Sequence, residues 1–171
     1  LFEVDVPNGR YRVTAGTNLV SGTVTLGDYV GSAFGSDKVL LTAHVFSGAT
    51  EVQTVPVLVT PVLGTGSYTL ALNSDLSGSV TIKMEGPTWL KQSATTTVVP
   101  NGAATVNFTL LNGDSVKDGI VDLSDYTVIV TAFNADPLAG NWNVAADLNR
   151  DDIVDLTDYT VVVSNFNAQD N

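Results

Sequence analysis

The 171-residue chain contains no cysteine, one histidine and only seven basic residues. The lack of cysteine excludes disulfides and thiol chemistry. The shortage of lysine and arginine argues against nucleic acid as a partner, because no basic patch exists to meet phosphate. No apolar run approaches the length of a membrane span, and the first residues lack the basic start and cleavage site of a signal peptide. We therefore expect neither nucleic-acid binding nor membrane insertion.

Catalytic arrangements are missing as well. The lone His44 lies in an alternating apolar segment, which favours a structural role, and the chain has no glycine-rich phosphate loop. Trp89, Tyr68 and Phe108 could line a sugar-binding face, but the cores of β-sandwiches use the same residues. The sequence predicts a non-enzyme, with carbohydrate as a possible but unsupported partner.

Acidic residues are concentrated at one end of the chain. Residues 112–171 hold eleven aspartates against two basic residues, whereas residues 1–111 hold seven acidic residues against five basic ones. A small segment with so much like charge should repel itself when folded unless cations neutralise it. This asymmetry predicts two domains of different chemistry.

Short apolar-alternating segments fill the first two thirds of the chain. Turn-forming clusters separate segments at 19–26, 38–46, 51–59, 67–72, 79–85, 95–99 and 103–110. Strands at this spacing predict an antiparallel β-sandwich over residues 18–111, with Pro56 at an edge or bulge. Residues 1–17 form a separate N-terminal segment, in which Asn8-Gly9 predicts a hairpin turn.

Four stretches of the predicted sandwich resemble the carboxypeptidase-regulatory-like, transthyretin-like β-sandwich family. They read SGTVTL, GSYTLAL, GSVTIKMEGPTWLK and AATVNFTL, within residues 21–110. The resemblance implies an Ig-like or transthyretin-like fold over residues 18–111. It also implies a spacer or attachment role for that domain.

Residues 119–134 are nearly copied 33 residues later, at 152–167. The valines and threonines in both copies favour strands by composition. However, Leu123, Tyr126, Val130 and Phe133 recur with helical spacing, and Leu156, Tyr159, Val163 and Phe166 repeat that spacing. We therefore predict two helices whose apolar faces pack together.

Before each predicted helix, oxygen-bearing residues follow the ligand spacing of an EF-hand loop. Calcium prefers six to eight oxygen ligands, and such a loop can supply them from side chains and one backbone carbonyl. The predicted ligands of the first loop are Asp114, Asp118, Ile120, Asp122 and Asp125. Those of the second loop are Asp147, Asn149, Asp151, Ile153, Asp155 and Asp158.

The duplicated loop and helix resemble the type I dockerin family, over about residues 112–167. There are two departures from the family pattern. Val116 replaces an oxygen ligand at the third loop position, and Asp152 stands where a glycine is usual. We expect Ca²⁺ in both loops, with the second site binding more tightly.

The resemblance implies docking to a cohesin-type domain through Leu123, Ser124, Leu156 and Thr157, with two possible orientations. The predicted fold class is mainly β with a small α part: an antiparallel β-sandwich followed by a duplicated loop-helix, EF-hand-like domain. The predicted function is a non-catalytic, extracellular calcium-binding assembly module. The alternative is a self-assembling filament or surface-layer subunit, in which copies of the chain exchange an N-terminal strand and calcium stabilises the fold.

Overall fold

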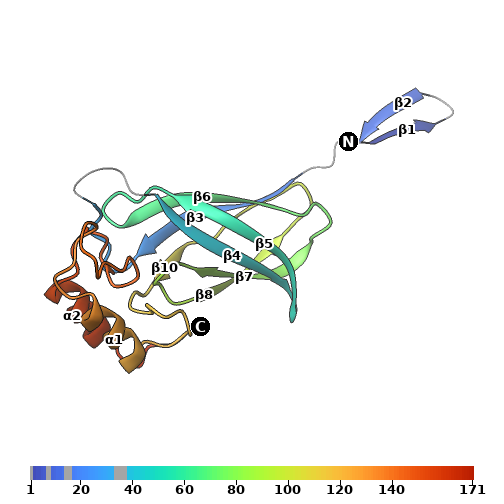
Figure 1. Cartoon of the computed structure of the whole chain (residues 1–171). Coiled ribbons are helices and arrows are strands. Elements are labelled where there is room, and N and C mark those ends of the chain that lie inside the picture. The colour runs from blue at the N-terminus through green and yellow to red at the C-terminus, as the bar shows by residue number, and fades with distance from the viewer. Residues whose placement is uncertain (1, 7–8, 14–16, 33–37) are drawn as a thin grey trace.

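The computed structural model describes residues 2–6, 9–13, 17–32 and 38–171. Strands come first in this part of the chain and two helices come last (Figure 1). The strands are β1 (Phe2–Val6), β2 (Gly9–Val13), β3 (Asn18–Leu26), β4 (Val39–Ser47), β5 (Thr50–Val59), β6 (Thr65–Leu72), β7 (Gly78–Glu85), β8 (Gln92–Val98), β9 (Ala103–Thr105) and β10 (Phe108–Leu110). The helices are α1 (Leu123–Thr131) and α2 (Leu156–Ser164). The mainly β fold with a small α part is therefore confirmed.

Two sheets enclose the main core, as the strand pattern predicted. One sheet has the order β5-β4-β7-β8. The other has the order β10-β3-β6, and β9 also pairs with β3. Pro56 lies in the edge strand β5, where its missing N–H costs no hydrogen bond between central strands.

The segment 103–110 was predicted as one antiparallel strand, and this prediction is wrong. It forms β9 and β10, and both run parallel to β3. The break falls at Val106, whose carbonyl oxygen would lie 1.7 Å from a Cβ atom at Gly22. Beside it, Asn107 Oδ1 accepts the amide of Thr23 at 2.9 Å. Parallel pairing is possible because the chain reaches β9 by crossing from β8 in the opposite sheet, without a hairpin turn.

Alternating side chains of both sheets fill the sandwich core. In β6, for example, every second residue is buried. The buried Trp89 donates its indole N–H to the carbonyl of Gly27 at 2.9 Å, which satisfies its one polar atom. The rings of Tyr68 and Phe108 lie 6.1 Å apart in the same core. These three aromatic residues therefore belong to the interior and do not form a sugar-binding face.

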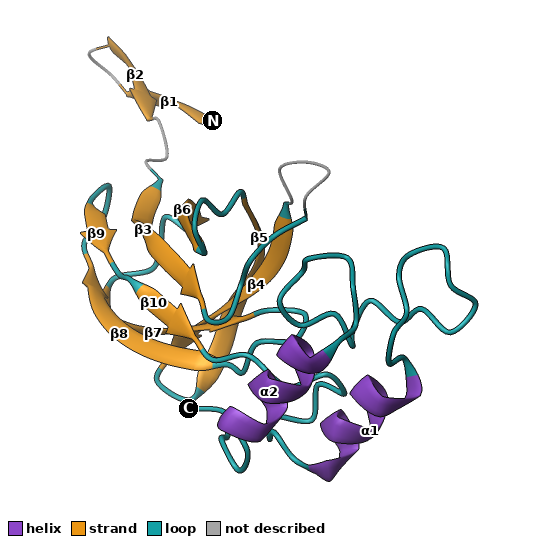
Figure 2. Cartoon of the chain, turned by 90° about the vertical axis from the view of Figure 1, so that its left-hand side faces the viewer, coloured by secondary structure: helices purple, strands orange, loops and turns teal. Residues whose placement is uncertain are grey.

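The N-terminal strands pair with one another, as predicted. β1 and β2 are antiparallel, with Phe2 opposite Val13 and Val6 opposite Gly9. Asn8 of the predicted turn lies outside the described residues. The hairpin stands apart from both sheets in the two views of the chain (Figure 1 and Figure 2).

A second, smaller core lies between the helices and the end of the sandwich (Figure 2). Trp142, between the two loops, packs against this core. Leu90 also belongs to it, whereas its neighbour Trp89 belongs to the sandwich core. Contacts therefore cross the domain boundary predicted at residue 112. In the described part of the chain, no helix is long and apolar enough to cross a bilayer.

Candidate cation-binding loops and helical face

Each loop is closed at its start by one aspartate. The carboxylate of Asp114 accepts the amides four and five residues later, at 3.1 and 3.0 Å. Asp147 accepts the amides at the same two offsets, at 3.2 and 3.1 Å. Both side chains therefore turn inward and fold the following backbone around themselves.

A second aspartate, in the first turn of each helix, closes the loop from the other end. Asp125 accepts the amides nine and three residues before it, at 3.1 and 2.8 Å. Asp158 accepts three amides, ten, nine and three residues before it, at 2.7, 3.2 and 2.9 Å. Each helix is thereby fixed to the loop that precedes it, and the second loop has one more such bond.

The other predicted ligands organise the middle and the end of each loop. Asp118 accepts the amide of Ile120 at 3.2 Å, and Asp151 accepts that of Ile153 at 3.1 Å. The N-terminal caps of the two helices are Asp122 and Asp155; each accepts the amide two residues later at 2.7 Å and forms a capping box with the next loop aspartate. Such boxes satisfy amides that a helix start otherwise leaves unpaired.

The third loop position distinguishes the two copies. Asn149 donates its side-chain N–H to Asp151 and to the hydroxyl of Thr157, both at 2.9 Å. Its oxygen accepts the amide of Asp151 at 3.0 Å. Val116, at the same place in the first loop, has no oxygen in its side chain and is 41% exposed.

Four of the loop carboxylates are buried, and burial raises the affinity of three of them for protons. Asp125 and Asp158 are 0% exposed, and Asp114 and Asp147 are almost as deeply buried. Burial raises the pKa of Asp147 to about 6, against the opposing effect of the amide of Asp152. Burial also raises the pKa of Asp114 and that of Asp158. These carboxylates lie where a positive charge would stabilise their ionised form.

The loop carboxylates point toward backbone amides instead of converging on one point. Among the described residues, no group of three or more His, Cys, Asp or Glu side chains is placed to hold a metal ion. Carboxylates without a cation repel one another, and loop amides are the alternative partners within reach. The donor set still suits a hard cation, because it consists of carboxylate, amide and carbonyl oxygens. The buried acidic loops therefore fit calcium by chemistry, and calcium binding stays a prediction.

The two loop-helix units are interlocked. Val121, at the end of the first loop, exchanges backbone hydrogen bonds of 2.9 and 2.8 Å with residues 167–168 behind α2. Val154, at the end of the second loop, exchanges bonds of 2.9 and 2.8 Å with residues 134–135 behind α1. The arrangement has an approximate two-fold relation, in which each loop is held by the segment that follows the other helix.

The prediction that one apolar face of each helix packs against the other is wrong. The tyrosines of those faces do meet: the rings of Tyr126 and Tyr159 lie 5.7 Å apart, edge to face. The other members of the two faces are exposed: Leu123, Val130, Phe133, Leu156, Val163 and Phe166. We call these six residues the apolar helical face.

The loop aspartates explain the rotation of the helices. Asp125 must point into the loop to accept its amides, so residues four and seven positions later also point inward. Those residues are Ile129 and Ala132, and both are buried. In the second copy, Asp158 and Val162 are buried at the equivalent places. Hydrophobic periodicity alone does not show this, because the residue that fixes the rotation is charged.

The four residues predicted to contact a partner lie at the start of the helices. Leu123 and Leu156 are 67% and 64% exposed, and Ser124 and Thr157 are also exposed. The hydroxyl of Thr157 donates to Asp155 at 2.6 Å. The leucines therefore belong to the apolar helical face, and their role in partner binding is untested.

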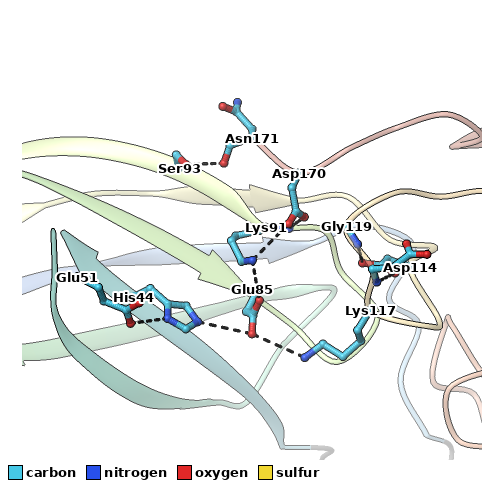
Figure 3. Close-up of polar contacts among 11 residues, drawn as sticks. His44, Glu51, Glu85, Lys91, Ser93, Asp114, Lys117, Gly119, Asp170 and Asn171 are labelled. Carbon is cyan, nitrogen blue, oxygen red and sulfur yellow. Dashed lines mark hydrogen bonds and ion pairs between the residues drawn. The ribbon is translucent and has the colours of Figure 1, made fainter. Parts of the chain in front are cut away.

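A network of charged side chains connects the first loop and the C-terminal residues to the sandwich (Figure 3). The carboxylate of Glu85, at the end of β7, lies 3.3 Å from Lys91 Nζ, 3.6 Å from His44 Nε2 and 3.8 Å from Lys117 Nζ of the first loop. Lys91 Nζ also lies 3.3 Å from Asp170 Oδ2. His44 is thus part of a structural network, in keeping with the role its sequence context favoured.

No protein-family model matches the chain. No curated protein matches it either. The dockerin-like and carboxypeptidase-regulatory-like resemblances therefore have no support from sequence comparison.

Among the solved structures that are similar in fold are two interface mutants of a type II cohesin–X-dockerin complex from Acetivibrio cellulolyticus. The C-terminal interface mutant matches with a TM-score of 0.63 and the N-terminal interface mutant with 0.61. In both cases the identity is 21%, over 88% of this chain and 96% of the other. A match over 88% of the chain is longer than the hairpin and sandwich together, so it also takes in part of the helical region. At this identity the likeness shows the fold, and it agrees with the β-sandwich described above.

Proposed function

We propose that the chain is a non-catalytic, extracellular docking module, in which calcium organises residues 112–171 and the apolar helical face binds a cohesin-type domain. The observation that carries this proposal is the exposure of six large apolar side chains on two adjacent helices and on the turns that follow them. Exposed apolar patches on soluble proteins mark interaction sites.

Calcium is the part of the proposal that explains why the apolar helical face exists. The aspartates that turn Ile129 and Val162 inward are those predicted to bind the ion, and the same rotation leaves the six apolar residues outside. Ion binding would neutralise carboxylates that burial otherwise destabilises. Loss of the ion should therefore loosen the helices and remove the partner surface.

A cohesin-type partner is supported by the similar complexes, each of which contains a type II cohesin and an X-dockerin. In such an assembly, the short passage from β10 to the first loop would hold the helical part in a fixed position on the sandwich. A larger polypeptide carrying this module would then be anchored to its scaffold through a stiff joint.

A binding assay with a purified type II cohesin tests the proposal. We expect a complex in size-exclusion chromatography and calorimetry when calcium is present, and none when calcium is chelated. The variant Leu123→Asp combined with Leu156→Asp should abolish binding. The matched control is Leu63→Asp, because Leu63 is 98% exposed on the sandwich, far from the helices in the chain.

Contrary outcomes have separate meanings. Binding that survives both leucine substitutions would exclude the apolar helical face. A chain that forms calcium-dependent multimers without cohesin would favour the self-assembly alternative. Removing residues 1–17 would then show whether the N-terminal hairpin makes those contacts.

A further inference from the structure

The sandwich contacts the second loop at one predicted ligand, Asn149, and at Asp152, which is not a predicted ligand. The amides of Val30 and Gly31 both donate to the carbonyl of Asn149, at 2.8 and 3.1 Å. The hydroxyl of Ser32 donates to the carboxylate of Asp152. These contacts come from the turn that follows β3, more than a hundred residues earlier in the chain.

The buried Asn112 makes a further contact to the second loop. The side-chain N–H of Asn112 donates to the carbonyl of Leu148 at 2.7 Å, and Asn112 is itself 0% exposed. The backbone of residues 148–149 is therefore held from two sides. Fixing that backbone also fixes the direction in which Asn149 presents its side-chain oxygen.

The first loop is held differently. Its entry is bound to the sandwich, because the amides of Gly113 and Asp114 donate to the carbonyl of Thr88 at 3.0 Å each. Its middle is bound instead to the end of the chain, where the amide of Asp170 donates to the carbonyl of Gly119 at 2.9 Å. The amide of Val116 donates to Asp125, as the amide of its counterpart Asn149 donates to Asp158, so this bond is common to both loops.

Asp152 occupies a backbone conformation that favours glycine. Its φ is +70°, and its counterpart Gly119 has φ +86°. Aspartate tolerates this left-handed region better than most residues, but at a cost. A glycine would remove that cost and would also remove the carboxylate that Ser32 contacts.

We infer that Ser32 and Asp152 are positioning residues, through which the sandwich sets the shape of the second calcium loop. Partners outside the direct ligands orient those ligands and tune affinity for the ion. The sandwich thus contacts the second loop at the predicted ligand Asn149 and at Asp152. It contacts the first loop at its entry, through Thr88, and at Lys117, through Glu85. This inference depends on the proposed calcium binding.

Calcium titration of the full-length, ¹⁵N-labelled chain tests the inference, because the amide signals of Gly119 and Asp152 report on the two loops separately. Ser32→Ala should weaken calcium binding at the second loop about tenfold and leave the first loop unchanged. Ser32→Thr keeps the hydroxyl and should bind like the wild type. Ser21→Ala is the matched control, because Ser21 bonds to Thr69 within the sandwich, at 3.1 Å.

Three results would overturn the inference. One is wild-type affinity at the second loop of Ser32→Ala. Another is an equal loss at both loops together with a lower melting temperature of the calcium-free chain, which would indicate general destabilisation. The third is a wild-type chain in which the amide signals of Gly119 and Asp152 do not change when calcium is added. Of the three results, this one alone would also overturn the proposed function.

Discussion

The two loop-helix units have almost the same sequence pattern but different surroundings. In both, an aspartate at each end of the loop accepts hydrogen bonds from loop amides, and a third aspartate caps the helix. The second unit has an asparagine at its third position and is bound to the sandwich turn at residues 30–32. The first unit has Val116 at that position and is bound to the C-terminal residues. Duplication can therefore preserve a local fold while the contacts around each copy diverge.

Of the changes considered, calcium removal should have the largest effect on stability, because it affects both loop-helix units. We expect chelation to lower the melting temperature of the helical part by about 10 °C or more, since a ligand that binds only the folded state stabilises it. Circular dichroism at 222 nm follows the helices. The fluorescence of Trp89 follows the sandwich once Trp142→Phe has removed the second tryptophan, which packs against the helical core. An unchanged helical melting curve would contradict the prediction.

Removing the helix aspartate of one unit at a time should show which unit contributes more stability. Asp158 accepts three amides and Asp125 accepts two. We expect Asp158→Ala to lower the free energy of unfolding by about 3–5 kcal/mol, and Asp125→Ala by about 1–2 kcal/mol less. Urea denaturation in calcium measures both. Equal losses would show that the one additional amide bond to Asp158 adds no stability.

Acidification should stabilise the calcium-free chain. The pKa of Asp147 is raised to about 6, so the folded state binds more protons than the unfolded state between pH 3.8 and about 6. Stability from this group is complete below that window and is lost as the pH rises through it. The calcium-free chain should therefore melt at a higher temperature at pH 5 than at pH 7.5. With calcium bound, the order should reverse, because protons and calcium compete for the same carboxylates.

Restoring the missing oxygen should make the first unit more like the second. Val116 is partly exposed, so Val116→Asn costs little apolar burial. We expect calcium affinity at the first loop to rise about tenfold, which is about 1.4 kcal/mol. Val144→Asn, a valine exposed to a similar degree outside the loops, serves as the control. If Val116→Asn raised the calcium affinity of the second loop instead of the first, the alignment of the two copies would be contradicted.

The sequence was sufficient for the features that depend on local pattern. Alternation located the strands, and the duplicated aspartates located the loops that precede the two helices. It also predicted helices in segments whose valine and threonine content favours strands. These features depend on neighbours within about ten residues.

The features that sequence reasoning missed depend on distant contacts. The parallel pairing of β9 and β10 with β3 is decided by where the chain crosses between sheets. The outward rotation of Val130 and Val163 is decided by aspartates that turn inward to loop amides. The contact of Ser32 with Asp152 joins residues 120 positions apart. Asp152 stands where the family pattern has a glycine, and this was the one sequence feature that could have pointed to the contact with Ser32.

Both ends of the helical part attach to one short stretch of the sandwich. Its first residues bond to Thr88, and its last residues bond to Lys91 and Ser93. A pulling force applied at the helices would divide between two anchor points only a few residues apart in the sequence. A joint of this kind resists mechanical load better than a single flexible strand would.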